Sequence, residues 1–359
     1  MAASIDFSAL TLNPNDVRDF GALIRKSVLN APQIESVFNV YTGITNSDYI
    51  GLIRPTLGLI GKADGGCGAG ANVVGQAPTF QKQWDLKRLR IEKHECYTDL
   101  STNLAKFYRN TGTDISDLTN TQYLDYIASF IPDDINRMIW RKAWFDDTSA
   151  NNFVNGGKLT NGTDKTYFNV INGLWKQIFA ITTATPTQKV AIAGAGVANN
   201  AATTATQFST LTPDLALAAY QALVDAASPT LLAEPDLIFI STRSIAQKAA
   251  RKLQSLGQDS VMQKMEGGYE LSTIDGIQNL TVPFMDEVIL KYFNNGTTLD
   301  NPHRILLTTK SNLGLAFEGE EMFKQINIVF SAESEKNIIR IIDAMDAKVI
   351  DDEKIMLAI

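Results

Sequence analysis

The sequence predicts a mixed α+β protein that extends a long arm away from its body. Two strand-like segments, residues 49–54 and 79–95, enclose a glycine-dense stretch at 58–75. Further along the chain, short apolar runs typical of strands alternate with helical patterns. The composition, 45% hydrophobic and 20% charged over 359 residues, is ordinary for a soluble globular protein with two domains or one large discontinuous domain.

The arm, residues 48–96, lacks the pattern of a strand that covers a core of its own. Charged residues occur on both faces of its second strand-like segment, Lys82, Arg88 and Arg90 on one face and Asp85, Lys87 and Lys93 on the other. A strand with one buried face alternates apolar and polar residues, and a two-stranded ribbon is only marginally stable alone. We therefore expect another subunit to supply the partner surface, which favours assembly over catalysis. The predicted subunit contacts are Ile50, Leu52, Arg54, Lys82, Trp84, Leu86, Lys87, Arg88 and Arg90.

Two helical regions precede the middle of the chain. Asn13 is a plausible N-cap before Pro14, and an apolar stripe of Val17, Phe20, Ile24 and Val28 predicts a short helix. Helical patterns follow at 97–108 and at 121–147, the latter interrupted at Pro132. After that proline, acidic residues at 133–134 and basic residues at 137–142 match the helix dipole. We predict a long helix packed along the body.

The remaining elements are predicted in order along the chain. Residues 167–181 suggest a helix, and the low-complexity Ala/Thr/Gly/Asn stretch at 182–210 predicts an irregular surface insertion. Thr212 and Pro213 begin a helix that ends near Ala227, and a strand at 237–240 leads into a helix at 242–256. A strand–turn–strand at 274–282, a strand at 303–309 and two final strands at 337–350 and 354–359 complete the chain.

Composition and motifs argue against several classes of function. A net charge of −7 argues against nucleic-acid binding over the whole surface, and the charge-free stretch at 190–213 is too polar to span a bilayer. No N-terminal signal is visible, and two cysteines fit a reducing compartment. The only histidines, His94 and His303, lie 209 positions apart, and no cysteine spacing resembles a zinc site. We predict no catalytic residue, no metal and no cofactor.

Two glycine-rich stretches have the spacing of a phosphate-binding turn. These are residues 66–71 and 190–196. Such a turn needs a helix to begin directly after it, so that the first backbone N–H groups face the phosphate. Neither stretch is followed by a helical pattern, and no Walker lysine is present, so a flexible loop is the favoured interpretation. A nucleotide site at Gly194 and Gly196 remains an alternative.

The order of these parts resembles the major capsid protein of tailed bacteriophages, with its Hong Kong 97-type fold. Residues 133–147, followed by Asn155-Gly-Gly157, look like the long spine helix and its loop, and 212–227, 235–242, 276–283 and 303–309 follow the layout of the axial domain. The resemblance is one of pattern and order over nearly the whole chain. It implies an N-terminal arm (1–44), an extended loop (45–97), a peripheral domain with the spine helix (98–165), an axial domain (166–325) and return strands of the peripheral domain (326–359).

The resemblance implies a structural protein and not an enzyme. It would assemble with itself, as hexamers and pentamers, into the icosahedral head shell that encloses double-stranded DNA without sequence-specific binding and without a membrane. Portal and decoration proteins are further partners, and the protein would be made in the bacterial host cytoplasm and located in the virion. About 45 residues precede the extended loop, too few for the built-in scaffolding segment of some family members, so we expect a separate scaffolding protein.

Two further points follow from the resemblance. Some family members cross-link a lysine to an asparagine on a neighbour; Lys62 lies in the loop, but neither partner nor catalyst can be matched, so no cross-link is predicted. An encapsulin-like compartment that stores an enzyme cargo would use the same fold. This compartment and a nucleotide-binding enzyme are the alternatives to a phage shell.

Overall fold

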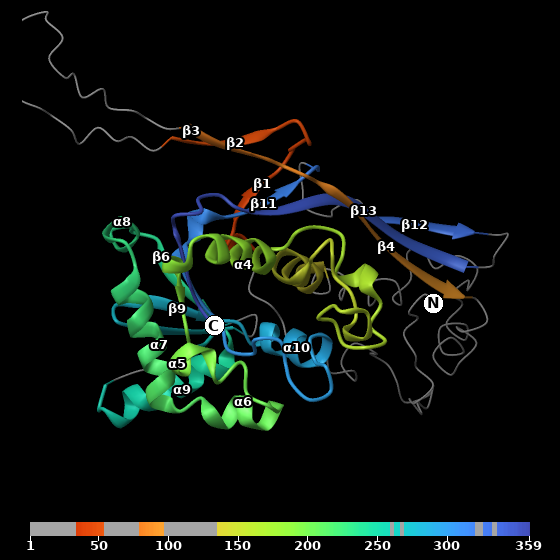
Figure 1. Cartoon of the computed structure of the whole chain (residues 1–359). Helices are drawn as coiled ribbons and strands as arrows, with labels where there is room; N and C mark the ends of the chain where they lie inside the picture. Colours follow the sequence, from red (N-terminus) through yellow and green to blue (C-terminus); the bar gives the residue numbers. More distant parts are fainter. Residues whose placement is uncertain are drawn as a thin grey trace, which may run out of the picture.

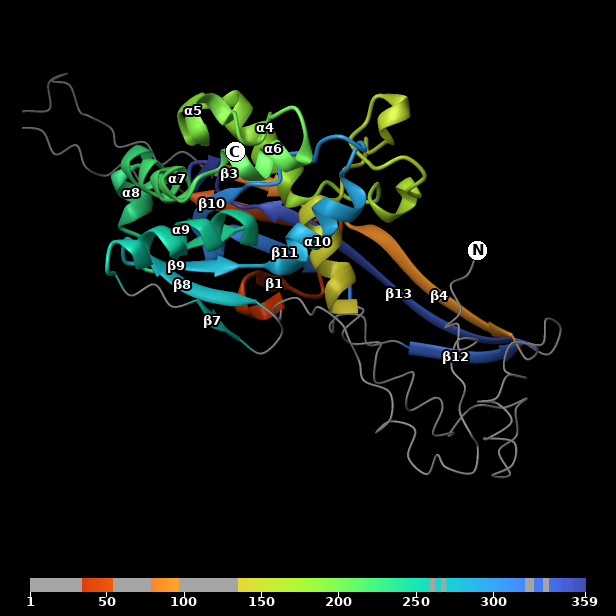
Figure 2. The same cartoon turned by 90° about the horizontal axis from the view of Figure 1, so that it is seen from below.

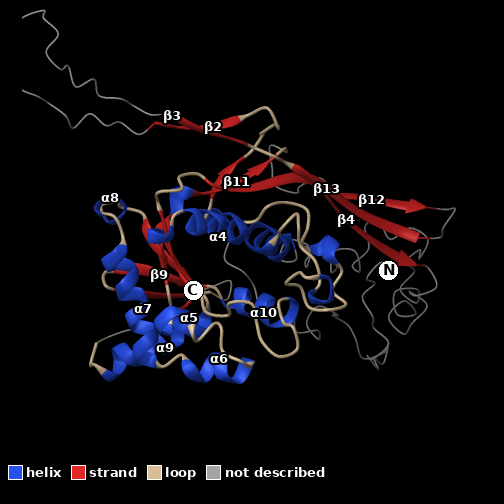
Figure 3. Cartoon of the chain, viewed as in Figure 1, coloured by secondary structure: helices blue, strands red, loops and turns tan. Residues whose placement is uncertain are grey.

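The computed structural model describes residues 34–53, 79–96, 135–258, 262–265, 269–319, 326–331 and 336–359. These residues form a seven-stranded sheet, a five-stranded sheet and a two-stranded ribbon, together with helices (Figure 1). Figure 3 shows the helices gathered around one of the sheets, while the other sheet extends away from them. The helices predicted before residue 34 and at 97–108, the glycine-dense stretch and Lys62 lie outside the described residues.

The elements follow one another in this order. The strands are β1 (Asn39–Tyr41), β2 (Tyr49–Ile53), β3 (Thr79–Gln83), β4 (Lys87–Cys96), β5 (Lys189–Val190), β6 (Leu237–Ser241), β7 (Gln263–Lys264), β8 (Glu270–Ile274), β9 (Ile277–Thr281), β10 (Ile305–Thr309), β11 (Leu313–Phe317), β12 (Ile326–Ser331), β13 (Lys336–Val349) and β14 (Ile355–Ala358). The helices are a segment at 135–145, α4 (Leu174–Ala184), α5 (Ala193–Gly196), α6 (Thr204–Thr210), α7 (Pro213–Ala226), α8 (Pro229–Leu232), α9 (Arg243–Ser255) and α10 (Pro283–Tyr292).

The seven-stranded sheet has the order β5-β14-β10-β6-β9-β8-β7 and is covered on both faces. Side chains of a strand point alternately to opposite faces, so the two faces feed separate cores. In β6, Ile238 and Ile240 join one core, whereas Phe239 joins the other with Tyr220 of α7 and Ile245 of α9. The first core contains residues of α4, α10 and the 135–145 helix. The sheet is therefore a central layer between two sets of helices.

Local signals fix several of these elements where the sequence predicts them. Thr212 accepts a hydrogen bond from the N–H of Leu215 and caps α7, with Pro213 at the first helical position. The tight connection between β8 and β9 places Asp275 and Gly276 at positive φ, of 50° and 79°. This conformation suits an Asp-Gly hairpin turn.

The five-stranded sheet is organised around the long strand β13. Its first ten residues pair with β4, from Lys336↔Cys96 to Met345↔Lys87, and its last five pair with β11. Strand β12 pairs with residues 336–341 of β13 on the side opposite β4. Together, β4, β12 and the first part of β13 form a three-stranded part of the sheet that extends away from the helices (Figure 2).

The helix at 135–145 lies in the core beneath this sheet. Trp140 and Trp144 are fully buried with ring centroids 6.2 Å apart, and Phe38 packs against both. Arg304 is also buried; its guanidinium donates to the backbone oxygens of Asn301 (2.7 Å) and Asp300 (2.8 Å). It lies 5.1–5.7 Å from three aromatic rings, those of Phe145, Trp175 and Phe179. Arg304 is thus an internal cation surrounded by aromatic rings.

The expected surface insertion at 182–210 is wrong. The chain instead completes α4, adds β5 to the large sheet and forms α5 and α6. Asn199 and Gln207 are buried, and the Asn199 amide bonds both the N–H and the C=O of His303, each at 2.9 Å. The side-chain amides of Asn199 and Gln207 form hydrogen bonds with backbone groups of residues 199, 299 and 303. Low complexity in this stretch therefore does not mean irregular structure.

Three other expectations are corrected by backbone contacts. The helix expected at 167–181 begins only at Leu174. The backbone N–H of the preceding Gly173 donates to the Asp146 carbonyl (2.7 Å), which holds the chain there. The approach is so close that a Cβ added at Gly173 would lie 2.9 Å from the Asp146 backbone. Strand β4, expected in the extended loop, belongs to the five-stranded sheet. Strand β14, expected with the peripheral return strands, pairs with β10 in the seven-stranded sheet. The remaining domain boundaries stay a prediction.

Candidate assembly interface

The ribbon formed by β2 and β3 projects from the body (Figure 1). Its antiparallel register places Tyr49 opposite Gln83 and Leu52 opposite Phe80, so Ile50, Leu52, Phe80 and Lys82 share one face. Two aromatic side chains stay largely accessible, Tyr49 at 54% and Phe80 at 48% exposure. The register places these two rings on opposite faces of the ribbon, so each face carries an accessible aromatic side chain that suits contact with another protein surface.

The root of the ribbon is held by hydrogen bonds to its own chain. The side chain of Asn46 accepts from the N–H of Leu86 (2.6 Å), and its backbone oxygen accepts from the Gln83 amide (2.7 Å). The N–H of Trp84 donates to the Asp48 carbonyl at 3.1 Å. These bonds cross-link the two strands where they leave the sheet, so the direction of the ribbon is set by the body.

A small apolar cluster lies under that root. Trp84 and Leu86, 2% and 7% exposed, pack with Ala316 of β11 and Ala344 of β13, and Ile50 packs against the cluster. The Tyr41 ring lies 5.6 Å from that of Trp84. A Cβ at Gly314 would approach the Trp84 ring at 3.1 Å, so the small residue at 314 makes room for the indole. The ribbon is therefore joined to the five-stranded sheet by a packed contact.

Charged groups complete the junction. The carboxylate of Asp346 accepts from the N–H of Asp85 (2.8 Å) and pairs with Lys348 (3.1 Å). Burial raises the pKa of Asp346, while the Lys348 ammonium opposes that rise. Within β3, the Lys82 ammonium donates to the Asp352 carboxylate (2.6 Å) and to the Val349 carbonyl (2.7 Å). The long-range bonds to residues 346–352 tie the ribbon to the end of β13.

The structure divides the predicted subunit contacts into three groups. Trp84 and Leu86 are buried by their own chain, so they hold the ribbon and leave little surface for a neighbour. Lys82, Lys87 and Arg90 make ion pairs within the chain, with Asp352, Asp85 and Glu92 respectively. Ile50 and Leu52 are half-buried, Arg88 is exposed, and Arg54 lies outside the described residues. Contact between these nine residues and a neighbouring subunit stays a prediction.

Sequence reasoning missed Tyr49 and Phe80, the two most exposed apolar side chains among those of the ribbon that the structure describes. A signal was present, because both are aromatic residues in short strands with charged or amide neighbours. What the sequence could not show is which of the ribbon's apolar residues the body covers. Trp84 turns toward β11 and β13, and only the pairing of those strands creates the surface that buries it.

Within the described residues, no group of three or more His, Cys, Asp or Glu side chains could hold a metal ion, and no helix is long and apolar enough to cross a membrane. Gly194 and Gly196 lie in the four-residue turn α5 at φ of 56° and 74°. These positive φ values account for both glycines without a ligand, because L side chains rarely adopt that backbone conformation.

Comparison with solved structures decides the fold. The capsid of an empty GTA particle matches over 93% of this chain and 98% of the other, with a TM-score of 0.50 and 14% identity. A structure from Mycobacterium phage Ogopogo matches over 93% of this chain and 94% of the other, with a TM-score of 0.50 and 11% identity. The chain has the Hong Kong 97-type capsid fold. The α+β fold class expected from the sequence is confirmed.

The resemblance to the Hong Kong 97-type fold, predicted from the order of the sequence elements, is confirmed by the structural comparison alone. No protein-family model matches the sequence, and no curated protein matches it. The holo-encapsulin complex of Synechococcus elongatus also matches, over 95% of each chain, with a TM-score of 0.42 and 11% identity. That score is too low to weigh one kind of shell against another.

Proposed function

We propose that this chain is a major capsid protein that self-assembles into the icosahedral head shell of a tailed bacteriophage or a related particle. The observation that carries the proposal is the shared fold, which covers more than nine tenths of both capsid chains described above. Fold alone does not fix function, so the site must support it. The projecting ribbon supplies that support, because it offers exposed aromatic side chains on an arm that its own body cannot cover.

The proposed mechanism is geometric. The seven-stranded sheet with α7 and α9 would converge with its copies on the axis of hexamers and pentamers, and the ribbon would lie over a neighbour. Obligate interfaces of this kind commonly bury more than ~2,000 Å². Such a shell would enclose double-stranded DNA without reading its sequence, which the net charge of −7 supports. A separate scaffolding protein, a portal and a location in the virion belong to the same proposal.

Electron microscopy of the full-length chain expressed in bacteria tests the proposal. The expected result is closed, regular particles or, without a scaffolding protein, capsomers and irregular shells. A protein that stays monomeric at all concentrations, alone and with the products of its neighbouring genes, would refute it. Particles purified from the natural source that hold a protein cargo in place of DNA would favour the encapsulin-like alternative.

A variant connects the test to the ribbon. Replacing Tyr49 and Phe80 together by serine removes the exposed aromatic surface and leaves the buried Trp84 cluster in place. The expected result is a chain that melts close to the wild type but assembles poorly. Normal assembly of this variant would show that the ribbon contact is not what holds the subunits together.

A further inference from the structure

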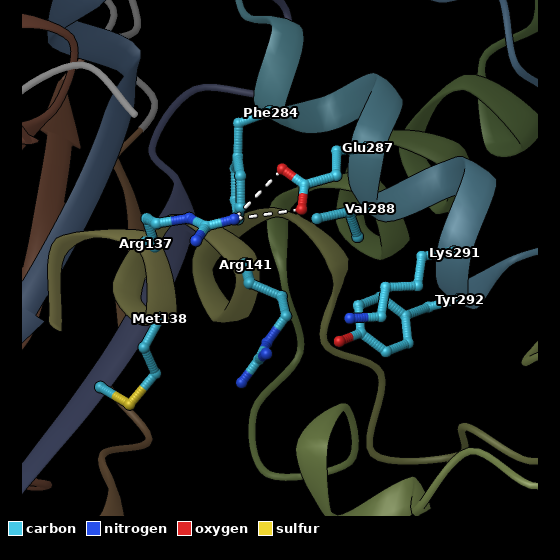
Figure 4. A pocket seen from close by; sticks show the side chains of 8 residues that line it. All are labelled: Arg137, Met138, Arg141, Phe284, Glu287, Val288, Lys291 and Tyr292. Carbon is cyan, nitrogen blue, oxygen red and sulfur yellow. Dashed lines mark hydrogen bonds and ion pairs between the residues drawn. The ribbon is translucent and has the colours of Figure 1, made fainter. Parts of the chain in front are cut away.

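A half-open pocket lies between the 135–145 helix and α10. Its volume is about 350 Å³, and cationic and aromatic side chains line most of it (Figure 4). Arg137 and Arg141 come from the first helix, and Phe284, Glu287, Lys291 and Tyr292 come from α10. Figure 4 shows the Lys291 amino group and the Tyr292 hydroxyl on the side of the pocket that faces Arg141. None of these residues belongs to the ribbon or its root.

The pocket carries an excess of positive charge. Arg137 is neutralised by Glu287, whose two carboxylate oxygens each lie 3.1 Å from one guanidinium nitrogen. In the part of the chain that the structure describes, no carboxylate pairs with Arg141 or Lys291. Among the described residues, these two cations therefore face the pocket without an acidic partner. Because like charges gathered in a half-buried space repel each other, such an arrangement favours a bound anion.

Aromatic rings hold these two cations in place. The Arg141 guanidinium lies 5.6 Å from the ring centroid of Tyr167 and 5.5 Å from that of Phe168, and the Lys291 amino group lies 5.1 Å from that of Tyr292. A cation over a ring is attracted through the ring's quadrupole and keeps its N–H donors for other partners. The Nε atoms of Arg137 and Arg141 are buried and have no acceptor among the described residues. The rings thus position the Arg141 guanidinium and the Lys291 amino group.

We propose that this pocket binds a phosphate group. The planar fork of an arginine fits the oxygens of a phosphate, and a lysine adds a second point of positive charge. The two unpaired cations match the charge of a phosphate, of about −1.5 to −2, better than that of a single carboxylate. The Tyr292 hydroxyl is a neutral donor beside them. The group comes either from a free phosphate or from the backbone of a nucleic acid.

Calorimetric titration of the full-length chain tests the site with two probes, inorganic phosphate and a short DNA duplex, at matched ionic strength. Arg141→Gln and Lys291→Gln remove the proposed contacts, and Arg251→Gln on the exposed side of α9 is the matched control. We expect saturable binding that weakens by about tenfold in each pocket variant and stays unchanged in the control. Lys291 is exposed on its helix, so its replacement tests the site even if the Arg141 variant does not fold.

The two probes separate the sources of the phosphate. Saturable, pocket-dependent binding of inorganic phosphate supports a site for a free phosphate, and such binding of the duplex alone supports a site for the nucleic-acid backbone. The proposal is overturned if neither probe binds in saturable fashion. It is equally overturned if Lys291→Gln and Arg251→Gln weaken binding to the same extent, because the binding is then general surface attraction.

Discussion

Replacing Trp84 by alanine should loosen the joint between the ribbon and the five-stranded sheet. The indole is 2% exposed and fills the space between Tyr41, Leu86, Ala316 and Ala344. A buried tryptophan removes about 250 Å² from water, which at about 25 cal/mol per Å² gives an upper value of about 6 kcal/mol. The unfolded chain already hides part of that area, and measured Trp→Ala changes lie at about 3–5 kcal/mol. We expect a loss in that range.

The assay is chemical denaturation of the unassembled chain followed by far-UV circular dichroism, which does not depend on the fluorescence of the deleted indole. Tyr49→Ala is the control, because this ribbon aromatic is 54% exposed and its loss should cost no more than about 0.5 kcal/mol. A Trp84→Ala variant within about 1 kcal/mol of the wild type would contradict the packed joint. Limited proteolysis gives a second readout, with faster cleavage near residue 84 expected in this variant alone.

Three further substitutions test the interior. Arg304→Met should lower the free energy of unfolding by about 3 kcal/mol, since the carbonyls of residues 300 and 301 lose their buried donor; an unchanged melting temperature would contradict this. Burial lowers the pKa of His303 to about 4, so the unfolded chain takes up a proton first as the pH falls. Relative to His303→Gln, the wild type should lose about 3 kcal/mol between pH 6.5 and 4, with no difference in slope above pH 7. Gly157→Ala should cost more than about 2 kcal/mol, because its Cβ would overlap the Asn151 carbonyl. Gly156→Ala, at φ of 79° in open space, should cost about 1 kcal/mol, and equal losses would contradict the clash.

The interior histidine shows how the pH effect arises from geometry. His303 Nε2 lies 3.1 Å from the Gln207 carbonyl, to which it donates, and Nδ1 lies 2.8 Å from the Ser244 hydroxyl, from which it accepts. This arrangement satisfies a neutral imidazole at both nitrogens. A second proton would leave Nδ1 as a donor beside a hydroxyl that must turn around, inside a buried site next to Lys248.

Several elements could be predicted because their signals are local. The cap at Thr212 and the proline after it begin α7 within one residue of the prediction. The apolar run that forms β6 and the helical pattern of α9 were placed correctly for the same reason. The arm was also recognised, since a glycine-dense stretch between two strand-like segments interrupts the sequence visibly. Each of these patterns depends on residues a few positions apart.

Part of the candidate site could not be predicted in this way. The sequence named Trp84 and Ile50 as apolar residues of the arm, but their burial depends on Ala316 and Ala344, more than 200 positions away. The cationic pocket depends in the same way on two helices, at 135–145 and α10, that are separated in the sequence by strands β5 to β9. Composition cannot report such contacts, because they exist only after distant segments have packed.

The sequence by itself determined the fold class, most of the helix and strand positions after residue 212, and the presence of an arm. The tertiary structure decided which strands pair, namely β4 with β13 and β14 with β10. It also made the small-residue stretch at 189–210 an ordered part of the body. The physical reason is that helices and turns are set by hydrogen bonds between near neighbours. A strand leaves its backbone groups for a partner anywhere in the chain, and only the packed core selects that partner.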